Sequence, residues 1–157
     1  MNARIAAAEL LVAVMDHGRA LDEALSETPS FNALQGRDRA FARALATAGL
    51  RRLGSINAVL SQFLERPLPD SAELGRALLH LGAAQLLVLG TPAHAAVGET
   101  VEAANSTPKA RGFAKLMTAV LRRVARDGPH DALHGSPVRD RPRARPRCGR
   151  SGRACRG

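Results

Sequence analysis

Five basic residues between positions 111 and 126 have the type and spacing to bind a polyanion. In a helix over this segment, four of them fall within one narrow arc: Arg111, Lys115, Arg122 and Arg126. Arg123 lies nearer the edge of the apolar arc on the other side, which holds Phe113, Leu116, Met117, Val120, Leu121 and Val124. No acid interrupts the basic arc, whereas an ordinary solvated helix face mixes both signs. The arc therefore predicts contacts to RNA; the alternative is that these cations only interact with the helix dipole, by about 0.3–1 kcal/mol each.

Two further cations are candidate RNA contacts. Arg39 and Arg43 are one helical turn apart on one face, with Asp38 beside them. The alternative for this pair is a solvated face with local ion pairing, which contributes little.

The sequence offers little support for catalysis. His94 and Glu99 are five residues apart, so they share a helix face poorly, and no third ligand converges on them. We therefore expect no catalytic residue, no metal and no cofactor, and we expect His94 and His80 to be packed, hydrogen-bonded histidines. Aromatic residues make up 3% of the chain, with no Trp or Tyr, which argues against recognition of splayed bases by stacking.

Composition divides the 157 residues into a domain at 1–128 and a tail at 129–157. The first part holds 15 Lys and Arg against 12 Asp and Glu, a net charge of +3, and the second holds 8 Arg against 2 Asp, a net charge of +6. The tail is rich in Arg, Pro and Gly and holds both cysteines, so we expect it to be disordered. The longest apolar run is too short to span a bilayer and no signal peptide is visible, which predicts a cytoplasmic protein without membrane contact.

Apolar periodicity predicts an all-α bundle of about seven short helices. Ser55, an Asp70–Glu73 capping box and Thr91 before Pro92 are the predicted starts of three of them. No segment shows a strand-like alternation. The expected ranges are 3–17, 21–25, 36–53, 55–64, 71–89, 92–105 and 111–126, and the fifth of these is expected to be the most buried.

Four blocks of residues, in this order, resemble the NusB-type RNA-binding domain. They are DRAFARAL at 38–45 with GLRRL at 49–53, ALLHLGAAQLL at 77–87, TPAHAAV at 91–97 with ETVE at 99–102, and AVLRRV at 119–124. The third block is most similar to the version at the N-terminus of bacterial 16S ribosomal RNA cytosine-C5 methyltransferases of the Sun/Fmu type. The resemblance covers about residues 3–127 and implies an RNA-binding helical bundle whose partner is ribosomal RNA. In NusB-like domains a basic N-terminal segment helps to bind RNA, and Arg4, in the first turn of the N-terminal helix, is the one residue here that matches it, so the resemblance makes Arg4 a further candidate RNA contact.

The chain departs from the family pattern in two ways. The family usually has Asn where this chain has Gly98 and Thr118. The family enzyme also continues into a methyltransferase domain with a Gly-rich S-adenosylmethionine loop and a catalytic Pro-Cys motif, and neither is present here. We therefore interpret the chain as an RNA-binding module that is not an enzyme by itself, and its tail as an out-of-frame reading that leaves a truncated product.

Three other functions are alternatives to this interpretation. One is an antitermination-type NusB module that works with a protein partner in transcription, and another is a helical protein–protein adaptor without an RNA role. The third, an enzyme active by itself, is disfavoured by the missing cofactor domain.

Overall fold

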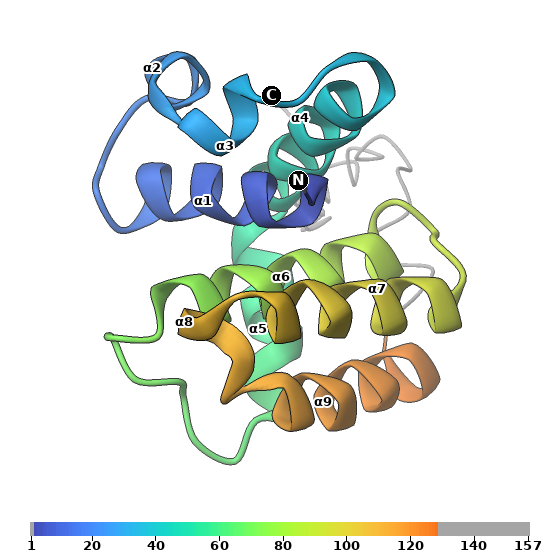
Figure 1. The fold of residues 1–157 in the computed structure, drawn as a ribbon. Helices are drawn as coiled ribbons and strands as arrows, with labels where there is room; N and C mark the ends of the chain where they lie inside the picture. The colour runs from blue at the N-terminus through green and yellow to red at the C-terminus, as the bar shows by residue number, and fades with distance from the viewer. Residues whose placement is uncertain (1, 129–157) are drawn as a thin grey trace, which may run out of the picture.

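The computed structural model describes residues 2–128, and the predicted tail lies outside them. Within this part the protein is all-helical, which confirms the predicted fold class (Figure 1). Nine helices are present there instead of the seven expected, because two four-residue helices fill predicted loops. The helices are α1 (Ala3–Met15), α2 (Leu21–Glu27), α3 (Pro29–Asn32), α4 (Gly36–Arg51), α5 (Leu53–Phe63), α6 (Glu73–Leu87), α7 (Ala93–Ser106), α8 (Pro108–Arg111) and α9 (Ala114–Asp127).

Helix α6 is the centre of the bundle, as its nearly continuous apolar sequence predicts. Every residue from Ala77 to Leu87 is buried. Helices α1 and α4 pack against it in the upper half of Figure 1, and α7 and α9 pack against it in the lower half. The α1–α4 end and the α7–α9 end of the domain are therefore both packed on α6, and each end presents a different surface to solvent.

Three predicted helix starts were wrong. Ser55 lies inside α5 and caps nothing, because Arg52 alone links α4 to α5 (φ −114°, ψ 24°). Asp70 stays exposed, and α6 begins at Glu73 with no side-chain cap. Helix α7 begins at Ala93, so Pro92 takes the cap position that was assigned to Thr91. Only Asn2 caps a helix with its side chain among those that the structure describes, accepting a hydrogen bond of 2.9 Å from the Arg4 backbone N–H.

A buried polar network joins α1, α6 and α7. Gln85 is fully buried, and its Oε1 accepts hydrogen bonds from Arg4 Nε at 3.1 Å and Nη2 at 3.0 Å. Its Nε2 donates to Thr100 Oγ1 at 3.2 Å and to the Leu81 carbonyl at 3.3 Å. Arg4 also forms an ion pair with Glu99 and lies 5.0 Å from the centre of the Phe41 ring. Every polar group of the Gln85 side chain is thus satisfied inside the core.

Gly82 lets α6 approach α7 and α9 closely. A Cβ at this position would lie 2.6 Å from Leu121 Cδ1 and 3.2 Å from Thr100 Cγ2. We expect Gly82→Ala to lower the free energy of unfolding, since overpacking of about 1–3 kcal/mol outweighs the gain of about 0.5–1 kcal/mol from removing a helical glycine. Gly98→Ala is the matched control, because a Cβ there meets nothing within 4 Å, and it should be stabilising. Urea unfolding measures both, and a stabilised Gly82→Ala would contradict the close approach.

His80 is a buried, hydrogen-bonded histidine, as predicted. Its Nε2 lies 3.0 Å from the Gly49 carbonyl oxygen, to which it donates, and its Nδ1 lies 3.0 Å from the side-chain amide of Asn57. Burial lowers the pKa of His80 from 6.5, against the opposing effect of the Gly49 hydrogen bond.

The lowered pKa of His80 makes stability depend on pH. Because the unfolded chain takes up this proton more readily than the folded one, the free energy of unfolding should fall as the pH drops below about 6.5. Denaturant titrations between pH 5 and 8 measure the slope. It should be reduced in His80→Gln and kept in His94→Gln, the same change at an exposed position.

Candidate nucleic-acid interface

Helix α9 presents three exposed cations along its outer face. Lys115, Arg122 and Arg126 lie within about 40° of one another around the helix axis, at 100° per residue. We call these three residues the α9 stripe. Lys115 and Arg122 make no ion pair or side-chain hydrogen bond with the residues that the structure describes. Arg126 pairs only with its neighbour Asp127, at 3.1 Å.

The opposite face of α9 fixes the orientation of the stripe. Met117, Val120, Leu121 and Val124 are buried against α6 and α7, as predicted from their spacing. Burying four such side chains contributes several kcal/mol, so the helix cannot rotate its cations inward at low cost. Leu116, however, is 39% exposed and Phe113 only half-buried, although both were predicted to share the buried arc.

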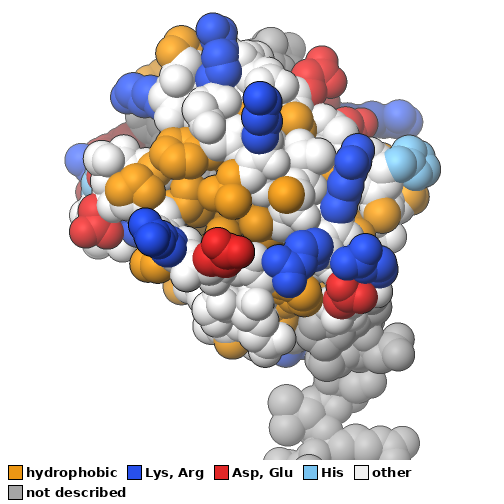
Figure 2. Space-filling view, turned by 90° about the horizontal axis from the view of Figure 1, so that it is seen from below, with side chains coloured by type: hydrophobic (Ala, Val, Ile, Leu, Met, Phe, Trp, Pro, Cys, Tyr) orange, Lys and Arg blue, Asp and Glu red, His pale blue; other side chains and the backbone are white. Residues whose placement is uncertain are grey.

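Leu116 and Phe113 border a surface cavity of about 490 Å³ between α9 and residues 63–69. Figure 2 shows the lower face of the molecule, where hydrophobic side chains form a patch bordered by several Lys and Arg side chains. Arg123 also lines the cavity between α9 and residues 63–69. Its guanidinium lies 5.3 Å from the centre of the Phe63 ring, and its Nη1 donates to the Phe63 carbonyl at 3.5 Å. Arg123 therefore helps to hold α9 against α5.

A groove of about 620 Å³ runs between α7 and α9 beside the stripe. Arg122 and Arg126 line the groove on the α9 side, and His94, at the start of α7, lines it on the α7 side. His94 is exposed, so its predicted packing role was wrong. The two departures from the family pattern, Gly98 and Thr118, also meet in this groove. The Thr118 hydroxyl donates back to the Ala114 carbonyl at 2.9 Å, which leaves the floor mainly apolar.

Arg111 is not part of α9. The predicted helix over 111–126 is interrupted at Gly112 and Phe113, so Arg111 ends the short helix α8. Its Nε donates to the Asn105 carbonyl at 3.0 Å, which satisfies the end of α7. The predicted four-residue arc is therefore a three-residue stripe with Arg111 displaced from it.

Arg39 and Arg43 lie on α4, at the other end of the bundle from α9 (Figure 1). The Arg39 guanidinium lies over the Phe31 ring, 4.7 Å from its centre. Arg43 is exposed and has no ion pair among the described residues. The two cations share a face with each other, as predicted, but they do not extend the α9 stripe.

Arg4 points into the bundle. Its side chain is only 15% exposed, and its guanidinium is engaged by Gln85, Glu99 and Phe41. Desolvation lowers the pKa of Arg4, while Glu99 and Glu102 act in the opposite direction. With its donors directed at the protein, Arg4 has a structural explanation, and we leave it out of the proposed surface.

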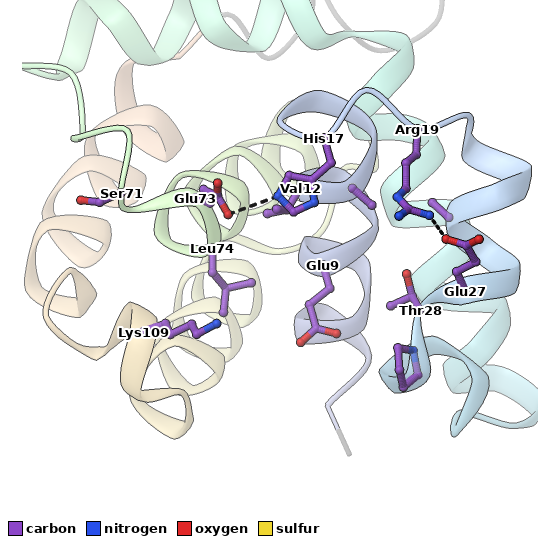
Figure 3. Close-up of a pocket in the computed structure, with 13 residues that line it drawn as sticks. Glu9, Val12, His17, Arg19, Glu27, Thr28, Ser71, Glu73, Leu74 and Lys109 are labelled. Carbon is purple, nitrogen blue, oxygen red and sulfur yellow. Dashed lines mark ion pairs between the residues drawn. The ribbon is translucent and has the colours of Figure 1, made fainter.

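A second large cavity, of about 740 Å³, opens between α1, the α2–α3 segment and the starts of α6 and α8 (Figure 3). Two pairs of oppositely charged side chains lie in it. His17 lies 3.6 Å from Glu73, and Arg19 forms an ion pair with Glu27. Glu9 and Lys109 contribute one more charge of each sign. The cavity therefore lacks the single sign of charge that would attract a polyanion.

Two negative findings concern the described residues alone. No group of three His, Cys, Asp or Glu side chains is close enough there to hold a metal ion. Each of the helices from α1 to α9 is too short or too polar to cross a lipid bilayer.

Comparison with known proteins gives one consistent result. The model of the NusB family matches residues 1–126. A ribosomal RNA small subunit methyltransferase B from Xanthomonas campestris is 48% identical over 130 residues, which cover 80% of this chain and 28% of the relative. Proteins of the same name from Vibrio vulnificus and Xylella fastidiosa strain 9a5c are 36% and 40% identical, covering 81% and 77% of this chain and 29% and 28% of the relatives. No solved structure matches. The chain thus spans little more than a quarter of the curated relatives that it matches.

Proposed function

The chain belongs to the NusB family, and from this premise we propose that its helical domain binds RNA through the α9 stripe. Ribosomal RNA is the proposed partner, because the relatives named above are ribosomal RNA methyltransferases. We further propose that the domain positions the RNA and makes no bond itself. Methyl transfer would then belong to the larger part of those relatives that this chain does not match.

The exposed cations of α9, of which Lys115 and Arg122 have no ion pair among the described residues, are the observation that carries the proposal. Lys115 and Arg126 are eleven residues apart, which is about 17 Å along the axis at 1.5 Å per residue. A stripe of this length can meet several successive phosphates of one strand, since each nucleotide carries one phosphate and successive nucleotides are only a few ångströms apart. Such contacts fix position and orientation without reading sequence. The absence of carboxylates other than Asp127 on α9 keeps the local potential positive.

A titration of the full chain with a fragment of small-subunit ribosomal RNA tests the proposal. At two or more salt concentrations, the logarithm of the binding constant should fall linearly with that of salt, with a slope near −2 to −3 if the stripe meets three phosphates. The same titration on Arg141→Glu/Arg143→Glu/Arg145→Glu removes positive charge from the tail alone. Binding that vanishes in this variant would show that the tail, and not the domain, holds the RNA.

A further inference from the structure

A second groove, on another side of the bundle from the α9 stripe, has the opposite charge. It lies between the C-terminal half of α1, helix α5, the start of α6 and residues 64–70, with a volume of about 620 Å³. We call it the α1–α5–α6 groove. Its apolar walls include Leu11, Val12, Met15, Leu60, Leu64 and Leu68. Met15 is 40% exposed, and Val12, Leu64 and Leu68 are only half-buried, so part of this apolar surface faces water.

Carboxylates surround the groove. Asp16, Glu65, Asp70 and Glu73 line it, against the single guanidinium of Arg76. Arg76 is already engaged, with Nη2 at 3.0 Å from Asp16 Oδ1 and Nη1 at 3.9 Å from Asp70 Oδ1. Asp70 nevertheless remains fully exposed, and Glu65 has no ion pair among the described residues. His80, on the floor, is kept neutral near pH 7 because burial lowers its pKa. Four carboxylates against one cation leave the groove with a charge of −3.

The apolar walls and the negative rim together indicate which kind of ligand the groove binds. A negative rim repels RNA phosphates, so the groove cannot extend the proposed RNA surface. Aliphatic walls of the kind found here bury the apolar face of an amphipathic helix, and exposed methionine adapts to varied side chains. Lys or Arg residues flanking that face would meet Glu65 and Asp70. We infer that the α1–α5–α6 groove docks a cationic amphipathic helix of a protein partner.

The inference is independent of the proposed RNA binding, because it uses different residues and the opposite sign of charge. Its direct test is a titration of the full chain with a Leu/Lys amphipathic helical peptide of about 18 residues. A Leu/Glu peptide with the same apolar face is the matched probe. We expect the Leu/Lys peptide to bind with a stoichiometry of one and the Leu/Glu peptide to bind at least roughly tenfold more weakly. Equal affinity for the two peptides, or no saturable binding of the Leu/Lys peptide, would overturn the inference.

Substitutions in the chain test whether the peptide binds in the α1–α5–α6 groove. Glu65→Lys/Asp70→Lys should weaken binding of the Leu/Lys peptide by roughly tenfold, and Met15→Asp should weaken it through the apolar wall. All three side chains are exposed, so the fold should survive, which circular dichroism checks. Asp22→Lys/Glu23→Lys makes the same charge change on α2, outside the groove, and should leave affinity within about twofold. Equal losses in the two double variants would mean that the peptide follows net charge, which would refute the groove.

Discussion

Lys115→Glu/Arg122→Glu/Arg126→Glu should weaken RNA binding by on the order of 100-fold at low salt while the domain stays folded. Three phosphate contacts are lost and three repulsions replace them. The slope of log affinity against log salt should shrink by about 2–3, since each phosphate contact contributes about 0.7–0.9. The buried face of α9 is untouched, because all three side chains are exposed. A salt series of RNA titrations, with circular dichroism on the same samples, measures both quantities.

The tail could hide this effect by binding RNA without specificity, and the matched variant removes that ambiguity. Arg141→Glu/Arg143→Glu/Arg145→Glu carries an identical change of six charge units. We expect it to lower affinity less than the α9 variant does. If the α9 variant keeps native helicity and binds RNA as tightly as the unmodified chain, the stripe is not the interface and the proposal fails.

Gln85→Leu should cost about 3 kcal/mol of unfolding free energy. The substitution keeps the side-chain volume similar but removes the acceptor for Arg4 and the donor to Thr100. The Arg4 guanidinium, only 15% exposed, would lose a partner that water cannot fully replace. Chemical denaturation at pH 7 measures the loss directly.

The double variant Arg4→Met/Gln85→Leu separates a hydrogen-bond penalty from a packing penalty. Removing both partners leaves no buried charge unpaired, since the Glu99 side chain is 51% exposed, so the double variant should be more stable than the sum of the two single changes predicts, by about 1–3 kcal/mol. Strict additivity would show that Arg4 and Gln85 act independently, contrary to the two hydrogen bonds between them.

Periodicity predicted the main helices because burial decides them. The residues from 77 to 87 are apolar except for His80 and Gln85 and form no polar face, and α6 is accordingly the central helix. Gly18, with φ +67°, lies just beyond α1, where a left-handed residue follows a helix end. The starts of α5, α6 and α7 could not be predicted from Ser55, Asp70 and Thr91, since capping competes with the path that tertiary packing imposes on each connection.

The candidate site could be predicted only in part, because helical periodicity describes the faces of a single helix and not the contacts between helices. Periodicity identified Lys115, Arg122 and Arg126 as neighbours on one helix face, and all three are exposed in the structure. It could not show that the helix is interrupted at Gly112 and Phe113, which separates Arg111 from α9, or that Gln85, 81 residues from Arg4, accepts hydrogen bonds from its guanidinium. The proximity of His94 to Arg122 has no local signal at all, since it arises from the packing of α7 on α9.

The position of α6 at the middle of the sequence has a consequence for synthesis. In a nascent chain that has emerged only as far as α5, α1 and α4 can contact each other but lack α6, against which both of them also pack. The later helices α7 and α9 also need α6, because they pack against another side of it. Vectorial folding in two separate halves is therefore disfavoured, and we expect a single cooperative transition that waits until α6 has left the ribosome.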